Sequence, residues 1–385
     1  MFKKSFFVTL IITTLFITKS FAQNPADTAN NTLSWPGTTG PLKPNPNPFK
    51  LDDVYISGVV SGLAQAQNNV ARGDKALQSD ISNAQVFIQK NTGLIHFYIE
   101  AGAYSQPDLG VPYLRSGLNE AAFYGIIPQG YLEIAPSDNF SFMIGKLAAF
   151  MGAEPTFSFQ NMNIQRGLLW DQSNSVNRGV QVNYSAGPFA IALSYNDGFY
   201  SNKYNWLSGT LTYTLDKANT FVLMAGGSLS RTNISTSATP LYQNNGQGYN
   251  LIYTHTSGSF IILPYLQYTV VPKSALLNTA QTARTYSAAM LVNYSVPHTG
   301  FSLPVRLEYI KTTGSAAQGA PNLMYGVGSN AWSATVTPTY QYKRVFVRSE
   351  FSYVRAGNIT SGMAFGPEGN DAMQSRVLLE TGFIF

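Results

Sequence analysis

The feature that most constrains this chain is a two-residue alternation of apolar and polar side chains that recurs along most of its length. In residues 207–215 (LSGTLTYTL), Leu, Gly and Tyr occupy the odd positions, and Ser or Thr the even ones. Period two is the signature of a β-strand with two different faces. A soluble β-sandwich has such strands too. Here, however, the polar face is small and almost uncharged, and Tyr and Trp lie near the ends of the apolar face. This combination is typical of strands placed between lipid and a watery lumen.

The low charge content supports a membrane location. Charged residues make up 11% of the chain, whereas soluble domains have about 25%. A membrane-crossing helix needs about 20 consecutive apolar residues, and the chain beyond its N-terminal region has no such run. Lipid cannot satisfy exposed backbone groups, so the remaining spanning structure is a closed barrel. We therefore predict an all-β fold, a transmembrane antiparallel β-barrel of about sixteen strands.

The connections between the alternating segments support the barrel. The predicted strands lie near residues 53–66, 82–90, 93–104, 122–136, 139–147, 175–186, 188–197, 204–215, 219–231, 246–256, 259–271, 284–296, 301–312, 330–342, 344–356 and 374–385. Short turns alternate with longer loops, the longest at 148–174. Bacterial outer-membrane barrels have short periplasmic turns and long external loops. An even number of strands then places both chain ends on the periplasmic side.

The N-terminal region predicts export. Residues 1–22 contain Lys3 and Lys4, an apolar run over 6–17 and the small-residue end Ser-Phe-Ala, so we interpret them as a signal peptide cut after Ala22. Residues 23–50 are polar and proline-rich, which favours a plain periplasmic linker over a plug in the barrel or a contact with the cell wall. The barrel would then occupy residues 51–385 in the cell outer membrane.

The last strand carries a further signal. In residues 376–385 the positions Val377, Leu379, Thr381, Phe383 and Phe385 share one face, and the chain ends on Phe. This resembles the C-terminal signal of Gram-negative outer-membrane proteins. The resemblance implies that Phe383 and Phe385 are recognised by the barrel-assembly machinery.

The mature chain resembles sixteen-strand porins, and one stretch resembles the β-barrel porin family called OmpL-like. The motifs are Gly145-Lys146 at a strand end, then Gly152-Ala153-Glu154, then Arg178-Gly179 opening the next strand. The resemblance implies a pore for passive diffusion of small hydrophilic solutes or ions, a homotrimer and no enzymatic activity. It also implies that the loop between the fifth and sixth strands folds into the lumen and narrows it.

The loop at 148–174 has the composition expected for such a constriction. It contains nine large apolar residues, and its only charges are Glu154, Arg166 and Asp171. An external loop has no reason to be so apolar, because apolar loops seek cover. We expect Glu154, Arg166 and Asp171 at the constriction, with the two carboxylates presenting negative charge to solutes. An outward loop that packs over the barrel mouth or onto another protomer is the alternative.

Alternation also predicts which charges line the pore wall. The side chains expected to point into the lumen are Glu100, Arg306, Glu308, Arg348, Glu350, Arg376 and Glu380. They could set ion selectivity, because a narrow pore focuses their field. They could equally neutralise one another as a lattice in the wall. Lys146 and Arg178 have lipid-facing parity, which suggests a bulge at Lys146, or rim positions that contact lipopolysaccharide phosphate.

The remaining chemistry is sparse. The chain has no Cys, and its histidines, His96, His255 and His298, match no metal-binding spacing, so we predict no metal and no cofactor. We also find no nucleic-acid signature. Two alternatives stay open: a closed-barrel adhesin or binding protein acting through its external loops, and an outer-membrane lipase using His255. Partners would be outer-membrane lipid, lipopolysaccharide and small solutes or ions.

Overall fold

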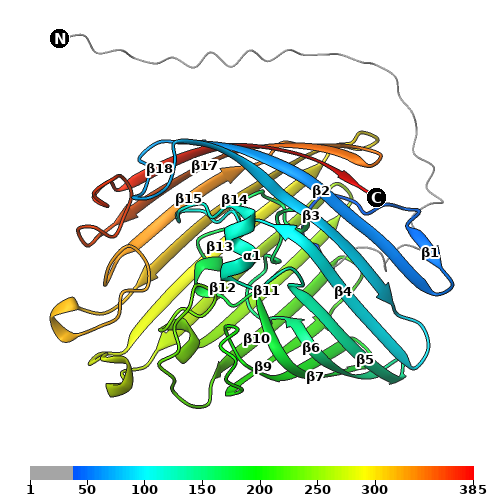
Figure 1. Cartoon of the computed structure of the whole chain (residues 1–385), viewed down its shortest axis with the longest axis horizontal. Coiled ribbons are helices and arrows are strands. Elements are labelled where there is room, and N and C mark those ends of the chain that lie inside the picture. The colour runs from blue at the N-terminus through cyan, green and yellow to red at the C-terminus, as the bar shows by residue number, and fades with distance from the viewer. Residues whose placement is uncertain (1–37) are drawn as a thin grey trace, which may run out of the picture.

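The structure, a computed structural model, describes residues 38–385 and is built almost wholly of long tilted strands (Figure 1). The predicted signal peptide at 1–22 and most of the predicted leader lie outside the described residues. The strands are β1 (Phe49–Leu51), β2 (Val54–Gln67), β3 (Leu77–Lys90), β4 (Ile95–Tyr104), β5 (Gln129–Ser137), β6 (Phe140–Ala148), β7 (Val176–Ala186), β8 (Phe189–Asn196), β9 (Trp206–Thr214), β10 (Asn219–Ser228), β11 (Gln247–Ser257), β12 (Phe260–Val271), β13 (Ala283–Ser295), β14 (Phe301–Thr312), β15 (Asn330–Val336), β16 (Thr339–Tyr342), β17 (Val345–Gly357) and β18 (Met373–Ile384).

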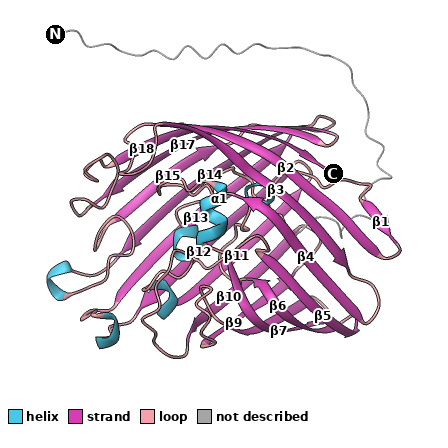
Figure 2. Ribbon diagram, in the orientation of Figure 1, coloured by secondary structure: helices cyan, strands magenta, loops and turns pink. Residues whose placement is uncertain are grey.

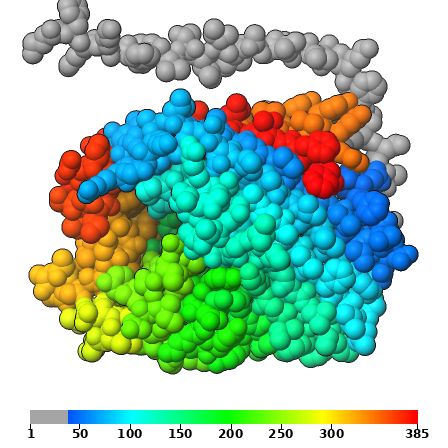
Figure 3. All heavy atoms as spheres, viewed as in Figure 1, coloured from blue at the N-terminus to red at the C-terminus, as the bar shows by residue number. Residues whose placement is uncertain are grey.

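Successive strands pair antiparallel, and the sheet closes on itself. The last strand, β18, pairs with β2 from Arg376 opposite Gln67 to Ile384 opposite Val59. In Figure 3 the red C-terminal residues accordingly lie beside the blue N-terminal strands. Both β15 and β16 pair with β14 and β17, so they are one wall strand interrupted before Pro338. Since β1 only extends the edge of β2 in a short hairpin, the wall is a closed antiparallel barrel of sixteen strands, as predicted.

The two faces of the wall follow the predicted alternation. On β9, Leu207 is 48% exposed on the outer face, whereas its neighbour Ser208 is 4% exposed. The same parity continues through the interruption between β15 and β16, where Trp332 is exposed and Thr335 and Thr339 are buried. Apolar side chains therefore face outward, toward the membrane, and small hydroxyl side chains face the lumen.

Helices are few and short, as Figure 2 shows. The single α-helix of the described residues is α1 (Ser116–Ala122), and the 3-10 turns are η2 (Ser158–Gln160), η3 (Trp170–Gln172), η4 (Gln243–Asn245), η5 (Ala275–Leu277) and η6 (Ala316–Gln318). Within residues 38–385, none of these has the length and apolar character needed to cross a membrane.

Two strand boundaries differ from the sequence prediction by five residues or more. The strand expected over 122–136 begins only at Gln129, because α1 ends at Ala122 and the chain then turns through Gly125, whose φ is 72°. The strand expected to begin at residue 82 begins at Leu77. The register shifts between Ser61 and Gly62 of β2, and Ser82 of β3 is left without a partner in the register. This bulge breaks the alternation within β3, which hides the start of the strand in the sequence.

Candidate functional site

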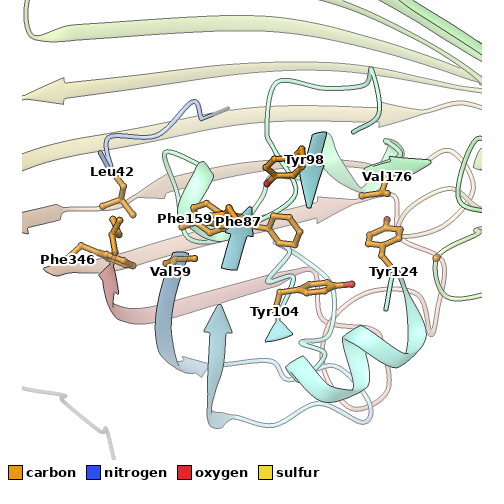
Figure 4. Packing of buried hydrophobic residues seen from close by; sticks show 12 residues of the cluster. Leu42, Val59, Phe87, Tyr98, Tyr104, Tyr124, Phe159, Val176 and Phe346 are labelled. Atoms are coloured by element: carbon orange, nitrogen blue, oxygen red, sulfur yellow. The ribbon is translucent and has the colours of Figure 1, made fainter. Parts of the chain in front are cut away.

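The loop between β6 and β7, residues 149–175, lies inside the barrel against its wall. Its rings Phe157 and Phe159 are fully buried. Phe159 packs on Phe87 of β3 with ring centroids 5.6 Å apart, and Phe157 meets Tyr104 of β4 edge-on at 5.2 Å. Figure 4 shows this aromatic cluster enclosed by strands. Burying such rings provides a large apolar contact that holds one end of the loop to the wall.

Charged side chains of β14 and β17 hold the rest of the loop. Arg306 of β14 forms an ion pair with Glu154, with Nη1 2.6 Å from Oε1. Arg348 of β17 donates to the backbone oxygens of Asn161 at 3.0 Å and Ser158 at 3.2 Å. Glu350, also of β17, accepts the backbone N–H of Ile164 at 2.5 Å and of Gln165 at 3.2 Å. Charge-assisted hydrogen bonds of this kind are about twice as strong as neutral ones.

The other predicted wall residues are buried in the same network or next to it. Glu380 pairs with Arg348 at 3.0 Å, and it accepts from the hydroxyl of Ser158 in the loop at 2.8 Å. Glu308 pairs with Arg306 at 3.2 Å. Apart from Glu308, at 5% exposed, each of the seven predicted wall charges is 0–2% exposed. These charges pair with one another in the wall and also bind the loop, a role that was not predicted from the sequence.

Two of the predicted wall residues, Glu100 and Arg376, form their hydrogen bonds outside that central network. Glu100 of β4 accepts from the amide of Gln85 at 2.5 Å and from the hydroxyl of Tyr98 at 3.0 Å. Arg376 of β18 donates to Gln67 on the neighbouring strand at 2.8 Å. It also donates to the backbone oxygen of Asp108 at 2.7 Å. Arg376 therefore reaches a different loop from the one that Arg306 and Arg348 hold.

That second inward loop, residues 105–128, was not anticipated from the sequence. Helix α1 within it is attached to β3 through Asp80, which accepts the backbone N–H of Ser116 at 2.6 Å and the hydroxyl of Tyr113 at 3.1 Å. The loop meets the first one where Asp108 pairs with Arg166 at 2.6 Å. Leu109 and Leu168 are buried in one apolar cluster at this contact. The two loops therefore fill part of the lumen as one packed body.

The three residues predicted at the constriction have different surroundings. Both carboxylate oxygens of Glu154 are engaged, one by Arg306 and the other by the N–H of Gly167 at 2.9 Å, and Glu154 is 4% exposed. Arg166 is 1% exposed, and its guanidinium lies 4.5 Å from the ring centroid of Trp170. Asp171 is half-buried, and its Oδ2 has no hydrogen-bond partner within the described residues. Burial and the neighbouring carboxylates Asp108 and Glu308 raise the pKa of Asp171.

Two cavities lie on the side of the lumen that the loops leave free. One of about 310 Å³ borders the 149–175 loop and is lined by polar groups such as Gln129 and Asn174, by apolar side chains such as Met151 and Trp170, and by Glu154 as its one charged residue. The other, of about 860 Å³, lies at the end of the barrel with the short turns. The surfaces beside the loop thus combine uncharged polar and apolar groups, and their few charged side chains are acidic.

Lys146 and Arg178 lie near the long-loop ends of β6 and β7, at rim positions as one of the two alternatives expected. The pairing of β6 with β7 runs without a shift past Lys146, so no bulge forms there. Lys146 donates to the backbone oxygens of Tyr124 and Ile127, and Arg178 pairs with the buried Asp197 at 2.7 Å. Both side chains are held by loops above the wall. The sequence could not show this, because the partners lie far along the chain or are backbone atoms.

No group of metal-ligating side chains is found among residues 38–385. Two of the three histidines are paired within the wall: His96 with Glu133 at 3.4 Å, and His255 with Asn219 at 2.8 Å.

Known proteins were compared with the chain by sequence and by structure. The family described as Putative beta-barrel porin-2, OmpL-like matches residues 53–385. No curated protein is a significant match by sequence. The outer membrane channel DcaP of Acinetobacter baumannii is similar in structure, with a TM-score of 0.58 at 12% identity over 88% of this chain and 99% of that one.

Two further structures show the same similarity. An anion-selective porin from Comamonas acidovorans has a TM-score of 0.58 at 10% identity, over 86% of this chain and 99% of that chain. The trimer form of OmpT from Vibrio cholerae has a TM-score of 0.54 at 10% identity, over 86% and 99%. At these identities the similarity concerns the fold.

Proposed function

The chain belongs to the OmpL-like β-barrel porin-2 family and is an outer-membrane porin, and we propose that the 149–175 loop sets the bore of its channel. The observation that carries this proposal is the attachment of the loop to buried charges of the inner wall through Arg306, Arg348 and Glu350. A loop held at several points keeps one position, so the free lumen beside it keeps one size. Solutes would pass by diffusion, without a cofactor.

The lining of the free lumen favours small hydrophilic solutes with weak charge preference. Glu154 cannot act as a bare negative charge, since Arg306 balances it in the wall. Among the three residues predicted at the constriction, Asp171 is the one that can still attract or repel a charged solute, because it has no ion pair within the described residues. We therefore assign the strong charges of the constriction to holding the loop, and the neutral amides and hydroxyls to contact with solutes.

Planar-bilayer recording tests this function directly. The purified protein should give regular current steps, and a variant in which residues 155–171 are replaced by a short Gly-Ser linker should give steps about twofold larger or more, because a wider aqueous lumen carries more ions. A control that shortens the external loop at 272–282, whose hydrogen bonds go to itself and to residues 315–319, should leave the step size nearly unchanged. A barrel that carries no regular current would instead support the closed adhesin.

We further infer that the porin has no enzymatic activity. The only lipase candidate, His255, lies on β11 with its Nδ1 bonded to Asn219 at 2.8 Å and near the hydroxyl of Tyr253 at 3.5 Å. Neither partner is a serine nucleophile. Ester hydrolysis by the protein in detergent, lost in His255→Ala, would contradict this inference.

Assembly is proposed on two grounds. The OmpT structure similar to this chain is described as a trimer form, and we propose a homotrimer, to be checked by the mass of the detergent-solubilised complex. Phe383 is 42% exposed on the outer face of the last strand. The backbone of Phe385 exchanges hydrogen bonds with Gly58 of β2. Both positions suit recognition by the barrel-assembly machinery before the wall closes.

A further inference from the structure

The first described residues of the chain, 38–48 (TTGPLKPNPNP), enter the barrel, and we call them the inserted segment. Residues 38–43 contact the inner loop and wall, whereas Pro46 and Asn47 are exposed. Leu42 is 1% exposed and belongs to a buried cluster with Val59, Phe346 and Ile384. These three side chains face inward near the barrel end that has the short turns. Figure 4 shows Leu42 directly beside Phe346 and Val59. The part of the leader interpreted as a plain linker is therefore an internal element of the barrel where the structure describes it.

The inserted segment is bonded to the loop that narrows the lumen. The backbone oxygen of Gln160 accepts from the N–H of Thr39 at 2.9 Å, from the N–H of Gly40 at 3.1 Å and from the hydroxyl of Thr38 at 2.5 Å. A Cβ at Gly40 would lie 2.3 Å from the backbone oxygen of Asn161. Since backbone cannot move aside as a flexible side chain can, this contact requires glycine.

The middle of the inserted segment is bonded to the wall at Lys43. The side-chain amide of Gln341, on the inner face of β16, accepts from the N–H of Lys43 at 2.8 Å and donates to its backbone oxygen at 2.9 Å. Four prolines, at 41, 44, 46 and 48, have no N–H and fix φ. A segment of this composition can lie in the lumen with few unpaired donors and loses little chain entropy on insertion.

The inserted segment also borders the space open to solutes. Thr38 and Thr39 line the cavity of about 310 Å³ together with Gln129, Trp170 and Asn174. The constriction therefore has two sides contributed by inserted chain: the 149–175 loop, and residues that precede the first strand.

We propose that the inserted segment is a size-determining element of the channel, which fixes the 149–175 loop from the periplasmic side and narrows the passage at Thr38 and Thr39. The proposal rests on the porin function given above. It assigns to the N-terminal segment a role in selecting small hydrophilic solutes by size, in addition to the role of the loop.

Paired glycine variants of the full chain test the proposal. Gly40→Ala should expel the segment, because the new Cβ meets backbone. Gly117→Ala is the matched control, since a Cβ at that position of α1 meets nothing within 4 Å. The single-channel conductance of Gly40→Ala should exceed that of Gly117→Ala about 1.5-fold or more, as expected when a narrow part of a pore widens. Leu42→Asp, which places a charge among Val59 and Phe346, should have the same effect by a different route.

A second readout reports position rather than stability. The chain contains no Cys, so a single introduced thiol is the only target for a thiol-specific reagent. A positively charged methanethiosulfonate reagent should reduce the current through Thr38→Cys stepwise. The same reagent should leave the current through Thr299→Cys, on an exposed turn, unchanged. Heat-modifiable migration on gels would confirm that each variant is a folded barrel.

The outcomes separate this proposal from the function on which it rests. Wild-type protein without regular current would overturn the porin channel and the inserted segment's role with it. Wild-type current, with unchanged conductance in Gly40→Ala and Leu42→Asp and no block of modified Thr38→Cys, would overturn the inserted segment's role alone.

Discussion

At the scale of single residues, the constriction depends on buried charges that have both an opposite charge and hydrogen bonds. Arg306 is fully buried between Glu154 and Glu308, and it also donates to the backbone oxygen of Gln165 at 2.7 Å. Removing one member of such a network leaves the other charges uncompensated, which costs far more than a surface ion pair contributes. The wall charges are thus sensitive positions even though they touch no solute.

Arg306→Ala should therefore lower the free energy of unfolding by about 3–5 kcal/mol. It should also make the current steps noisier, because the 149–175 loop loses an anchor. Urea titration in lipid micelles and bilayer recording measure the two effects. Arg344→Ala, at an exposed turn, is the control and should change stability by less than about 0.5 kcal/mol. An Arg306→Ala protein as stable and as quiet as the control would show that the network does not hold the loop.

Asp171 gives a pH-dependent prediction. Burial, Asp108 and Glu308 raise the pKa of this carboxyl, while Arg166 and Arg376 oppose the shift. A raised pKa keeps Asp171 neutral to higher pH than an ordinary Asp, so a negative charge appears only as the pH rises through the shifted value. Cation preference, read from the reversal potential in a KCl gradient, should increase over that range in the wild type. This pH-dependent change should be absent in Asp171→Asn. If the variant shows the same pH dependence as the wild type, another group is responsible.

At the scale of elements, the two inward loops differ in how far the sequence anticipates them. The wall strands were predictable, because the alternation that defines them is local and repeats in every strand. The 149–175 loop could be predicted to be covered from its run of Phe, Met, Leu and Trp. The 105–128 loop could not. Its attachment depends on backbone oxygens that accept from Arg376 and on Asp80 of a distant strand. Such contacts leave no pattern in the loop's own residues.

The inserted segment shows the same limit. Its prolines correctly exclude helix and strand, but Leu42 is the only large apolar side chain among residues 38–48. One apolar residue does not distinguish a linker from a buried segment. The surroundings of Glu154 were also predictable only in part. Its place on the loop follows from the sequence, but its ion pair with Arg306 does not, because the two residues are 152 positions apart.

The attachment of α1 provides a prediction at this scale. Asp80→Asn should loosen the 105–128 loop, because hydrogen bonds to a charged acceptor contribute about 1.5–3 kcal/mol each, more than bonds to a neutral amide. Hydrogen exchange followed by mass spectrometry should then show faster exchange of backbone amides in 105–128 and little change in 149–175. Asp138→Asn, on a turn of the opposite barrel end, should leave both loops unchanged. Equal acceleration in the two loops would mean that they open as one unit.

At the scale of the whole molecule, the barrel is closed by tight contact between its first and last wall strands. A Cβ at Gly58 would lie 2.2 Å from the ring of Phe385, so the terminal ring occupies the space that a side chain on β2 would take.

The closed wall also has an electrically asymmetric outer surface. Outward-facing positions of the described strands carry no Asp or Glu, and three exposed cations lie near the ends with long loops: Arg284 of β13, Lys311 of β14 and Arg355 of β17.

These three cations belong to one patch of the outer surface. Lys311 lies opposite Tyr286, which is two residues from Arg284 on the same face. Tyr309, two residues from Lys311, lies across from Trp332, and Trp332 lies across from Arg355. No acid of the described residues pairs with any of the three. Cations between aromatic rings at the external rim suit phosphate groups of the outer leaflet, so this patch, rather than Lys146 and Arg178, is our proposed lipopolysaccharide contact.

Replacing Arg284, Lys311 and Arg355 together by Gln should weaken the binding of lipopolysaccharide to the barrel on the order of a hundredfold, because each cation at a membrane surface contributes about 1 kcal/mol. Quantifying bound phosphate by mass spectrometry after detergent extraction gives the result. The matched control replaces Lys217, Lys343 and Arg344, which lie on turns at the other end of the barrel and so face the periplasm. Conductance should stay unchanged in both triple variants, because neither set touches the lumen. Equal loss of lipid from both variants would show that lipopolysaccharide binding depends only on net charge. No loss from either variant would contradict the proposed contact.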